Sequence, residues 1–339
     1  MNYRPGVTTA GLEPGAPQPL LEDLTRATDD VRRAMRSVIE GKDHVIDTAL
    51  TVLLAEGHLL VEDVPGVGKT MLAKALAASI GSSVRRIQFT PDLLPSDITG
   101  VSIYNQEERD FEFKPGPVFA NVVVGDEINR ASPKTQSALL ECMEERQVTV
   151  DGVTYALEPP FIVIATQNPV EMEGTYPLPE AQRDRFMARV SMGYPSTASE
   201  LDMLDTHAAH DPLQDLEPVA DAALVRRLVS VVRGVFASDA VKQYLVDLVA
   251  ATRTHPDLRL GASPRASLHL LRSCRAAAAL AGREHVLPDD VQLLAEPVLA
   301  HRLLLTADAL LARRTVPQVL ADVLAQVPVP GASGRRGRS

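Results

Sequence analysis

The tripeptide Gly-Lys-Thr at 68–70 is the part of this sequence whose residue types and spacing most directly indicate chemistry. It follows an apolar run at 59–61, which predicts a strand, and opens an alanine-rich stretch at 69–80, which predicts a helix ended by Gly81. Free backbone N–H groups and the helix dipole favour anions at such a helix start. Loop 63–70 is therefore expected to hold the phosphates of a nucleoside triphosphate.

The residues of this loop have separate expected roles. Backbone N–H groups would surround the β-phosphate, Lys69 would neutralise β- and γ-phosphate oxygens, and the Thr70 hydroxyl would be a ligand of Mg²⁺. The motif G-x-x-x-x-G-K-[ST] begins with glycine, but this chain has Asp63 there. That position loses freedom at φ > 0, although Gly66 and Gly68 keep the turn flexible. We therefore expect slower or weaker nucleotide use, rather than none.

A second apolar run, at 122–125, has the pattern of a buried strand and ends in two carboxylates, Asp126 and Glu127. In P-loop enzymes the acid at such a strand end holds Mg²⁺, and this role is assigned to Asp126. Glu127 would then polarise the attacking water as general base. The pair could instead cap the helix that opens at 131–133. Because a phosphate loop lies upstream, the catalytic interpretation is favoured.

A third apolar run, at 161–166, leads into Asn168. The carboxyl ends of parallel strands form the edge where α/β sheets bind ligands, so Asn168 is expected to touch the γ-phosphate and the lytic water. A turn-forming role before proline is the alternative. Further along, the polar segment 179–186 carries Arg183 and Arg185, whose guanidinium groups suit stabilisation of a transferring phosphoryl group. A solvated helix face would have the same composition.

The order of these segments resembles that of the MoxR family of AAA+ ATPases. The matching runs after the phosphate loop are Asp-Glu-Ile-Asn-Arg, Ala-Thr-Gln-Asn-Pro, Pro-Glu-Ala-Gln-x-Asp-Arg-Phe and Gly-Ala-Ser-Pro-Arg, at 126–130, 165–169, 179–186 and 261–265. Gln-Phe-Thr at 88–90 and Leu-Leu-Pro-Ser-Asp at 93–97 also resemble family signatures. The resemblance extends over roughly residues 27 to 305, and His-Arg-Leu at 301–303 resembles the family's lid.

The resemblance implies a role for each matched position. Lys69 and Thr70 are similar to the Walker A residues, Asp126 and Glu127 to the Walker B pair, and Asn168 to sensor 1. It implies nucleotide contacts at Gly41, Val64, Pro65, Gly66, Val67, Gly68, Lys69, Thr70, Met71 and Asp126, with Thr70 and Asp126 as metal ligands.

Two arginines complete the set that the resemblance implies. Arg265 is similar to sensor 2, which reaches the nucleotide from the lid, and Arg185 resembles the arginine finger that enters a neighbouring subunit's site. Arg183 stands where an apolar residue is more usual and competes for the finger role, but Arg185 is favoured. Ser263 is expected to cap the helix whose first turn holds Pro264 and Arg265, and Gly282 to end it.

Two segments are expected to form hairpins. Apolar and polar residues alternate over 148–155 around an Asp-Gly turn, which is a strong short-range hairpin signal. Upstream, 101–104 and 111–114 flank a charged turn. The resemblance implies a pre-sensor hairpin and an insert in the second core helix, which in ring ATPases face the pore or the partner. Solvent-exposed hairpins without such a role are the alternative.

Composition excludes several classes of protein. Of 339 residues 45% are apolar, enough for a sizeable core, and the net charge of -10 argues against nonspecific nucleic-acid binding. Cys142 and Cys274 lie in helical patterns without metal-like spacing and are expected to be core residues in a reducing compartment. The first 20 residues lack the apolar stretch of a signal peptide, and no apolar run approaches the length of a membrane span. A cytoplasmic protein is therefore expected.

The expected fold class is α/β: a P-loop core with a parallel sheet and inserted β-hairpins, followed by a smaller all-α lid. The expected division is a disordered segment at 1–20, the ATPase core at 21–195, a linker at 196–218, the lid at 219–330 and a disordered basic tail at 331–339. A metal site built from the His and Asp residues at 205–211 is disfavoured, because they lie in the linker.

The expected function is Mg²⁺-dependent ATP hydrolysis by a ring of identical subunits, with six as the expected number. By resemblance, the ring would act as a chaperone-like remodeller of a protein client, with a partner that carries a von Willebrand factor A domain. One alternative is a nucleotide-gated binding switch, which the Asp63 departure permits. Another is a nucleic-acid motor, which the acidic balance and the lack of aromatic–basic interleaving in the hairpins disfavour. A metal-chelatase motor subunit would differ only in its partners.

Overall fold

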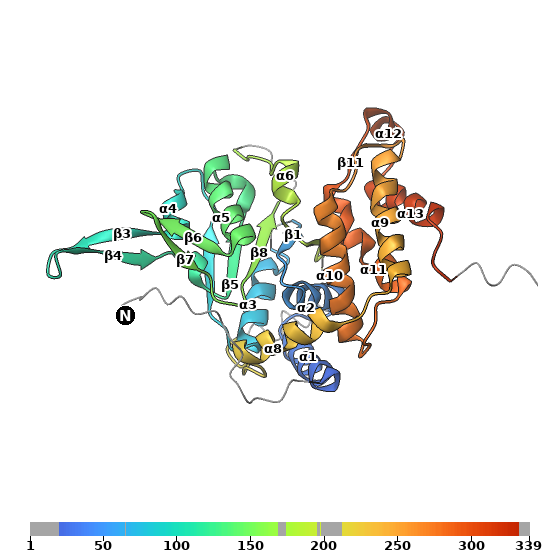
Figure 1. Ribbon diagram of the computed structural model, residues 1–339. Coiled ribbons are helices and arrows are strands. Elements are labelled where there is room, and N and C mark those ends of the chain that lie inside the picture. Colours follow the sequence, from blue (N-terminus) through green and yellow to red (C-terminus); the bar gives the residue numbers. More distant parts are fainter. Residues whose placement is uncertain (1–19, 65, 169–173, 195–196, 198–211, 332–339) are drawn as a thin grey trace, which may run out of the picture.

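A computed structural model of the protein describes residues 20–64, 66–168, 174–194, 197 and 212–331. An α/β core and a mainly helical lid pack side by side (Figure 1). The expectations for 1–19, Pro65, Pro169, most of the linker and the tail from 332 lie outside the described residues, as do the histidines and aspartates at 205–211.

The core comprises the following elements in chain order: α1 (Leu21–Arg36), α2 (Asp43–Leu54), β1 (Leu59–Glu62), α3 (Lys69–Ser79), β2 (Val84–Gln88), α4 (Pro95–Thr99), β3 (Gly100–Asn105), β4 (Asp110–Pro115), η1 (Pro117–Phe119), β5 (Val122–Asp126), η2 (Ile128–Arg130), α5 (Pro133–Glu145), β6 (Gln147–Val150), β7 (Val153–Ala156), β8 (Ile162–Gln167), α6 (Glu180–Arg183) and β9 (Ala188–Val190).

The remaining elements are α8 (Ala222–Gly234), α9 (Asp239–Thr254), β10 (Leu258–Leu260), α10 (Pro264–Leu280), α11 (Pro288–Leu299), η3 (Ala300–Arg302), β11 (Leu304–Leu305), α12 (Ala307–Leu311) and α13 (Val316–Gln326). The predicted α/β core with a helical lid is confirmed. The lid is not purely helical, because β10 and β11 pair as a small antiparallel sheet.

The central sheet has the order β2-β5-β8-β1-β9, and each pair of neighbours runs parallel. The three strands predicted from apolar runs are the three inner strands, and the predicted helix of the phosphate loop is α3. Parallel strands buried on both faces carry nearly continuous apolar runs, which explains why the sequence pattern identified them.

Alternate residues of each inner strand face two different hydrophobic clusters. Val122 and Val124 of β5 join a lid-side cluster, whereas Val123 joins an outer cluster on the other face of the sheet. The lid-side cluster contains residues of α1, α2, α3, α9, α10 and α11 and continues from the core into the lid. The outer cluster contains residues of α5 and Phe186. Because side chains alternate along a strand, one sheet can support both layers.

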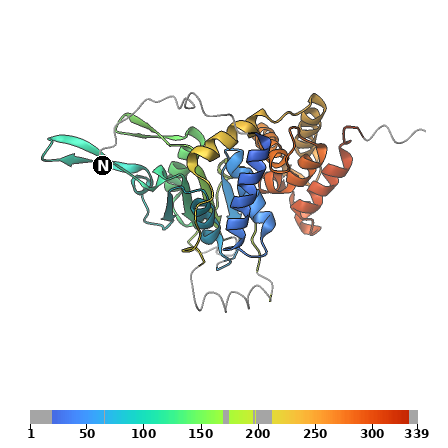
Figure 2. The same ribbon diagram turned by 90° about the horizontal axis from the view of Figure 1, so that it is seen from below.

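Both predicted hairpins are confirmed as β3–β4 and β6–β7. The β3–β4 hairpin projects far from the body of the core, with the β6–β7 hairpin beside its base (Figures 1 and 2). Phe113 of β4 stacks on Tyr155 of β7 with ring centroids 4.2 Å apart. This stack joins the bases of the two hairpins, and the outer half of β3–β4 extends beyond it.

The lid packs on the core mainly through α10, which contacts α1 and α2. Cys274 on α10 and Cys142 on α5 are both buried, as predicted. Helix α8, assigned to the lid from the sequence, also contacts the core helices α1 and α2. The backbone N–H groups of Val219 and Ala220 donate to the carbonyl oxygen of Ser79 at the end of α3. The boundary at residue 219 stays a prediction.

His58, directly before β1, joins two elements of the core. The N–H of Val163 donates to Nδ1 of His58 at 3.0 Å, and Nε2 lies 3.0 Å from the carbonyl oxygen of Met143. The ring is therefore neutral and donates through Nε2. Burial lowers the pKa of His58 to about 4, because a charged ring would have to be desolvated.

We expect His58→Asn to reduce the loss of stability in acid. The unfolded chain binds a proton at a histidine below pH about 6.5, while folded His58 does not until about pH 4. In this window His58 therefore adds stability that falls with falling pH, by up to about 1.4 kcal/mol per pH unit. Urea unfolding at several pH values should show a shallower slope in the variant than in the wild type. Equal slopes would contradict a neutral buried His58.

Candidate functional site

The predicted site residues converge on the carboxyl edge of the sheet. Strands β1, β5 and β8 end at Glu62, Asp126 and Gln167, and each strand hydrogen-bonds to its neighbour in parallel register. The N–H of Asp63 continues the ladder by donating to the carbonyl oxygen of Gln167 at 3.1 Å. The residues that follow these three strands, far apart in sequence, are thereby brought together.

The phosphate loop has the backbone geometry that an anion site needs. Gly66 and Gly68 have φ of 84° and 88°, the left-handed region that favours glycine. A Cβ at Gly66 would meet nothing within 4 Å, and one at Gly68 would lie 3.7 Å from Met192 Cε, so the space beside both is open. Gly68 is the N-cap of α3, and Lys69 and Thr70 form its first turn. Free N–H groups at this end can therefore receive phosphate.

The flanking positions lie against neighbouring parts of the core. Lys69 Nζ donates to the carbonyl oxygen of Asp63 at 2.6 Å, which folds the lysine back over the loop. Val67 and Met71 pack against the lid-side cluster, and half-buried Val64 donates its N–H to Asp63 Oδ1.

Asp63 differs from what the motif predicts about its backbone. It is not among the non-glycine residues with positive φ, so the absence of glycine causes no strain at this position. Asp63 is 9% exposed. Its carboxylate accepts hydrogen bonds from Val64 N at 2.8 Å, Ser191 Oγ at 2.8 Å and Gly193 N at 2.6 Å. Burial opposes ionisation, but these bonds outweigh it and lower the pKa of Asp63.

Asp63 thus ties the loop to the segment that follows β9. The same segment binds the turn before α2, because Lys42 Nζ donates to the carbonyl oxygens of Gly193 (3.2 Å) and Tyr194 (2.9 Å). Gly41, predicted to contact nucleotide, precedes Lys42 and has φ of 68°. Lys42, which follows Gly41, and Asp63 of the phosphate loop therefore both bind the segment 191–194.

Asp126 is held by two donors that the sequence analysis did not identify. Thr166 Oγ1 donates to Oδ1 at 2.6 Å, and Arg86 donates to Oδ2 from Nε at 3.0 Å and from Nη2 at 2.6 Å. Thr166 lies in the Ala-Thr-Gln-Asn-Pro run, so its position was available as a signal. A carboxylate has about four acceptor sites, so Asp126 retains capacity for a cation.

Glu127 has an unusual backbone conformation that a hydrogen bond to Thr166 stabilises. Its φ of 56° is left-handed, and its N–H donates to Thr166 Oγ1 at 2.9 Å. Its Oε2 accepts from Gln88 Nε2 at 3.1 Å and lies 3.2 Å from Arg130 Nη1. Such outliers cluster at functional sites, where the surrounding structure holds them. Thr166 therefore holds the carboxylate of Asp126 and the backbone of Glu127.

Asn168 is 4% exposed and lies directly after β8. Its carbonyl oxygen accepts from Asn129 Nδ2 at 3.4 Å. The amide oxygen of Gln167, one residue earlier, is buried without a hydrogen-bond partner among the described residues. The cationic Lys69 suits the phosphates of a nucleotide, and the oxygen atoms of Thr70 and Asp126 suit Mg²⁺. The unpaired amide oxygen of Gln167 is a further polar group beside them.

The two predicted arginines lie together. Arg185 Nε donates to Glu144 Oε2 at 2.7 Å, and Arg265 Nη2 donates to Glu144 Oε1. Neither guanidinium forms a hydrogen bond with the described residues of the phosphate loop. Arg183, the competing candidate, has a buried Nε without a partner in the described part of the chain. Glu144, on α5, carried no sequence signal, because a single glutamate on a polar helix face is common.

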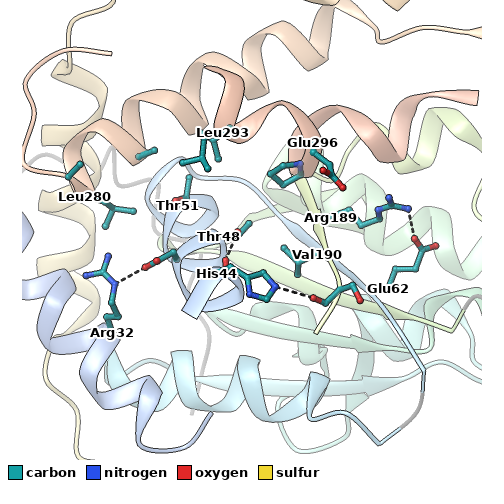
Figure 3. Close-up of a pocket in the computed structure, with 16 residues that line it drawn as sticks. Arg32, His44, Thr48, Thr51, Glu62, Arg189, Val190, Leu280, Leu293 and Glu296 are labelled. Carbon is teal, nitrogen blue, oxygen red and sulfur yellow. Dashed lines mark hydrogen bonds and ion pairs between the residues drawn. The ribbon is translucent and has the colours of Figure 1, made fainter. Parts of the chain in front are cut away.

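A cleft lies elsewhere, between α2 and the lid helices α10 and α11 (Figure 3). It measures about 810 Å³ and is lined by none of the phosphate-loop residues that the structure describes. Its charged side chains include two internal pairs, Arg32 with Asp47 and Arg189 with Glu62. Since these pairs neutralise each other, they do not indicate the charge of a ligand.

Within the described residues, His, Cys, Asp and Glu form no group of three that could hold a metal on its own. This is compatible with a Mg²⁺ that would bind mainly through phosphates and water. Among the helices of the described chain, none is long and apolar enough to cross a membrane.

Comparison with known proteins gives matches over both parts of the chain. Residues 58–188 match the model of the ATPase family associated with various cellular activities (AAA), and residues 250–323 match the AAA lid domain. Chaperone MoxR1 of Mycobacterium tuberculosis is 42% identical over 91% of this chain and 82% of its own length. Protein MoxR of Paracoccus denitrificans is 33% identical over 89% of this chain and 96% of its own.

Two further relatives cover nearly the same span. The YeaC protein of Bacillus subtilis is 51% identical over 91% of this chain and 95% of its own length. A crystal structure from Cytophaga hutchinsonii, solved as a candidate ATPase, has a TM-score of 0.86 and 38% identity, and the match covers 91% of this chain and 96% of that chain. The similarity therefore includes the core and the lid together.

We expect Asp63→Gly, although it restores the glycine of the motif, to weaken ATP binding. Removing the carboxylate leaves the donors of Val64, Ser191 and Gly193 without their acceptor. The loop conformation that would bind the phosphates is then less stable by about 1–3 kcal/mol. Calorimetric titration with a non-hydrolysable ATP analogue measures the effect, and Asp63→Asn, which retains one acceptor oxygen, is the control with the smaller loss. Tighter binding in Asp63→Gly would mean that loop freedom outweighs anchoring.

Proposed function

Since the chain belongs to the MoxR family of AAA+ ATPases, we propose that it hydrolyses ATP with Mg²⁺ as an oligomeric ring that remodels a protein client. The chaperone named MoxR1, which it resembles along most of its length, supports the chaperone-like part of this proposal. We further propose a hexamer, a cytoplasmic location and a partner with a von Willebrand factor A domain, as the family resemblance implies.

The observation that carries the proposal is the separation of the polar groups into two sets. Lys69, Asp126 and Glu127 lie at the carboxyl edge of the sheet, whereas Arg185 and Arg265 are held together by Glu144 on α5. Phosphoryl transfer in this class needs both sets around one phosphate. A ring would bring the arginines of one subunit to the phosphate loop of the next.

Within one subunit, the residues of the edge would divide the chemistry. The N–H groups of the loop and Lys69 would bind the phosphates. When Mg²⁺ is bound, Thr70 and Asp126 would hold it, and it would offset the charge of the phosphate oxygens. Glu127, with Oε2 held by Gln88 and Arg130, would accept the proton of the attacking water, and Asn168 would orient that water.

Glu144 would release the arginines at low cost. Its pairs with Arg185 and Arg265 involve side chains that are each about a third exposed. Pairs with this exposure contribute roughly 0–1 kcal/mol each, because water and salt screen them. A triphosphate, with its higher charge, would therefore compete successfully for both guanidinium groups.

The projecting hairpin would contact the client. Tyr104 and Phe111 form an edge-to-face pair 5.4 Å apart, and Phe111 is 69% exposed. Val101 and Ile103 of β3 are exposed as well. Exposed apolar side chains of this size on a two-stranded element mark an interaction surface. The tip at 107–110 has three acidic residues and one arginine, which favours a protein over a nucleic acid.

ATP turnover should depend on protein concentration and on both sets of residues. Specific activity should rise with concentration if sites are completed between subunits. Glu127→Gln should lower turnover by about 10²–10⁴-fold while nucleotide still binds, because only the proton acceptor is lost. Arg185→Ala should lower it by about 10³–10⁵-fold. Phosphate release, measured beside nucleotide binding, distinguishes these outcomes.

Arg183→Ala is the matched control for the finger. Normal turnover in Arg185→Ala with loss in Arg183→Ala would reverse the assignment of the finger. Activity that is independent of concentration would remove the shared-site part of the proposal. ATP-dependent retention of a partner, with no turnover in any condition, would instead favour a nucleotide-gated switch, and stimulation by single-stranded DNA would favour a nucleic-acid motor.

Phe111→Ser should weaken the response to a client. Loss of a buried Phe contact costs about 1.5–3 kcal/mol, so the concentration of an unfolded model polypeptide that half-stimulates the ATPase should rise by roughly 10-fold or more. Val153→Ser, an exposed position on the other hairpin, is the control with a smaller change. Equal stimulation of Phe111→Ser and wild type would exclude the hairpin as the client contact.

A further inference from the structure

Arg302 ends the short helix η3 in the lid, yet its side chain is only 2% exposed. Its guanidinium reaches the core segment that carries the candidate finger. Nη2 donates to the carbonyl oxygens of Asp184 (3.1 Å) and Phe186 (2.6 Å), and Nη1 donates to that of Met187 (3.3 Å). These three carbonyls flank Arg185 on both sides along the chain. Arg302 therefore sets the backbone conformation on which Arg185 stands.

Asp184 joins the same arginine to the helix that carries the second candidate. Its Oδ1 accepts from Arg302 Nε at 2.7 Å, and its Oδ2 accepts from Ser263 Oγ at 2.8 Å. Ser263 is the N-cap of α10, and its hydroxyl accepts the N–H of Ala266. The first turn of α10, which contains Arg265, is thereby fixed relative to Asp184.

The lid side of Arg302 is also occupied. Nη2 also lies 2.7 Å from Nδ1 of His269 on α10, so its two N–H groups are shared among three acceptors, and Nη1 donates to the carbonyl oxygen of Val298 on α11. Burial and the charge of Arg302 lower the pKa of His269 to about 2, so the ring is neutral and Nδ1 accepts. Each of the three guanidinium nitrogens thus donates inside one network that joins α10, α11 and the finger segment.

The hydrogen bonds of Arg302 are directional, whereas holding the lid on the core does not require directional contacts. The lid-side cluster already holds the lid to the core through apolar contacts, which are not directional. Replacing a buried ion pair by apolar groups is often neutral or stabilising, so the pair is weak evidence for stability alone. A planar fork of five donors instead orients several acceptors at once.

We propose that Arg302, Asp184 and Ser263 form a core–lid latch that positions Arg185 and Arg265 as one unit. The core–lid latch then keeps Arg185 of the core and Arg265 of the lid in one fixed relation to each other. The inference rests on the proposed function, in which these two arginines stabilise the transferring phosphoryl group. Arg302 has no contact with the phosphate loop among the described residues, so it acts as a positioning residue through the arginines.

Arg302→Lys tests the core–lid latch while keeping the charge. A lysine cannot reproduce the fork, so the finger segment shifts, and misplacement of about 1 Å costs roughly 10² in kcat. ATP affinity should stay within about twofold, because the phosphate loop is untouched. Arg283→Lys is the matched control: Arg283 makes a two-point pair with buried Asp290 inside the lid and does not contact the finger segment.

Two readouts separate positioning from general damage. The first is mixing with Glu127→Gln subunits, which cannot hydrolyse but present intact arginines. Turnover of Arg302→Lys should be restored by such mixing, as should that of Arg185→Ala. The second is a double-substitution cycle: in an Arg185→Lys background, Arg302→Lys should lower kcat by far less than it does alone. Thermal unfolding of each variant verifies the fold, and the isosteric Asp184→Asn serves if Arg302→Lys does not fold.

Some results of these experiments test the core–lid latch, and one tests the shared-site part of the proposed function. Restoration of Arg185→Ala without restoration of Arg302→Lys, full additivity in the cycle, or wild-type kcat in Arg302→Lys overturns the core–lid latch. Failure of mixing to restore Arg185→Ala removes the shared-site part of the proposed function. In that case the double-substitution cycle still tests the core–lid latch. Non-additive effects on kcat would show that Arg302 acts through Arg185, whether Arg185 contacts the nucleotide of its own subunit or of the next.

Discussion

The parallel register of the central sheet is the constraint on which the site depends. Strands β1, β5 and β8 run in the same direction, so their carboxyl ends must lie along one edge. A parallel arrangement requires a crossover connection between strands, and α3 and α5 serve as two of these connections. The start of α3 is therefore forced to the same edge as Asp126 and Glu127. An antiparallel sheet of the same strands would place these groups at opposite ends.

The supports of the site come from the same edge. Thr166 of β8 donates to the carboxylate of Asp126 and accepts from the backbone N–H of Glu127, so one hydroxyl holds two consecutive residues at the end of the neighbouring strand. Asp63 binds the segment after β9 on the other side of β1. Each support connects adjacent strands, which makes the geometry of the edge a property of the sheet rather than of any single loop.

The lid adds a second level of organisation. Its apolar contacts continue the lid-side cluster, while Arg302 provides directional contacts to the segment that carries Arg185. The core thus holds the groups that would bind nucleotide, and the core and lid jointly hold the arginines. This division separates the nucleotide-binding groups, which depend on the sheet, from the two arginines, which depend on the contact between core and lid.

Sequence patterns were sufficient where a local rule determines structure. The apolar runs, the Asp-Gly turn and the serine cap before α10 each depend on residues within a few positions, and all were predicted correctly. The φ at Asp63 is not positive, so this position does not require the backbone freedom of glycine, and slower or weaker nucleotide use stays a prediction. The rule described what glycine permits, but not what a carboxylate at that position could bind.

What the sequence determined by itself is therefore the three inner strands, the two hairpins, the helix of the phosphate loop and the chemical groups at the strand ends. Tertiary structure alone decided the partners of those groups. Asp63 meets Ser191 and Gly193 at separations of 128 and 130 residues, and Arg302 meets Asp184 at 118. A hydrogen bond depends on a distance of about 3 Å and an angle, and periodicity sets neither between segments so far apart. Packing of the lid against the sheet sets both.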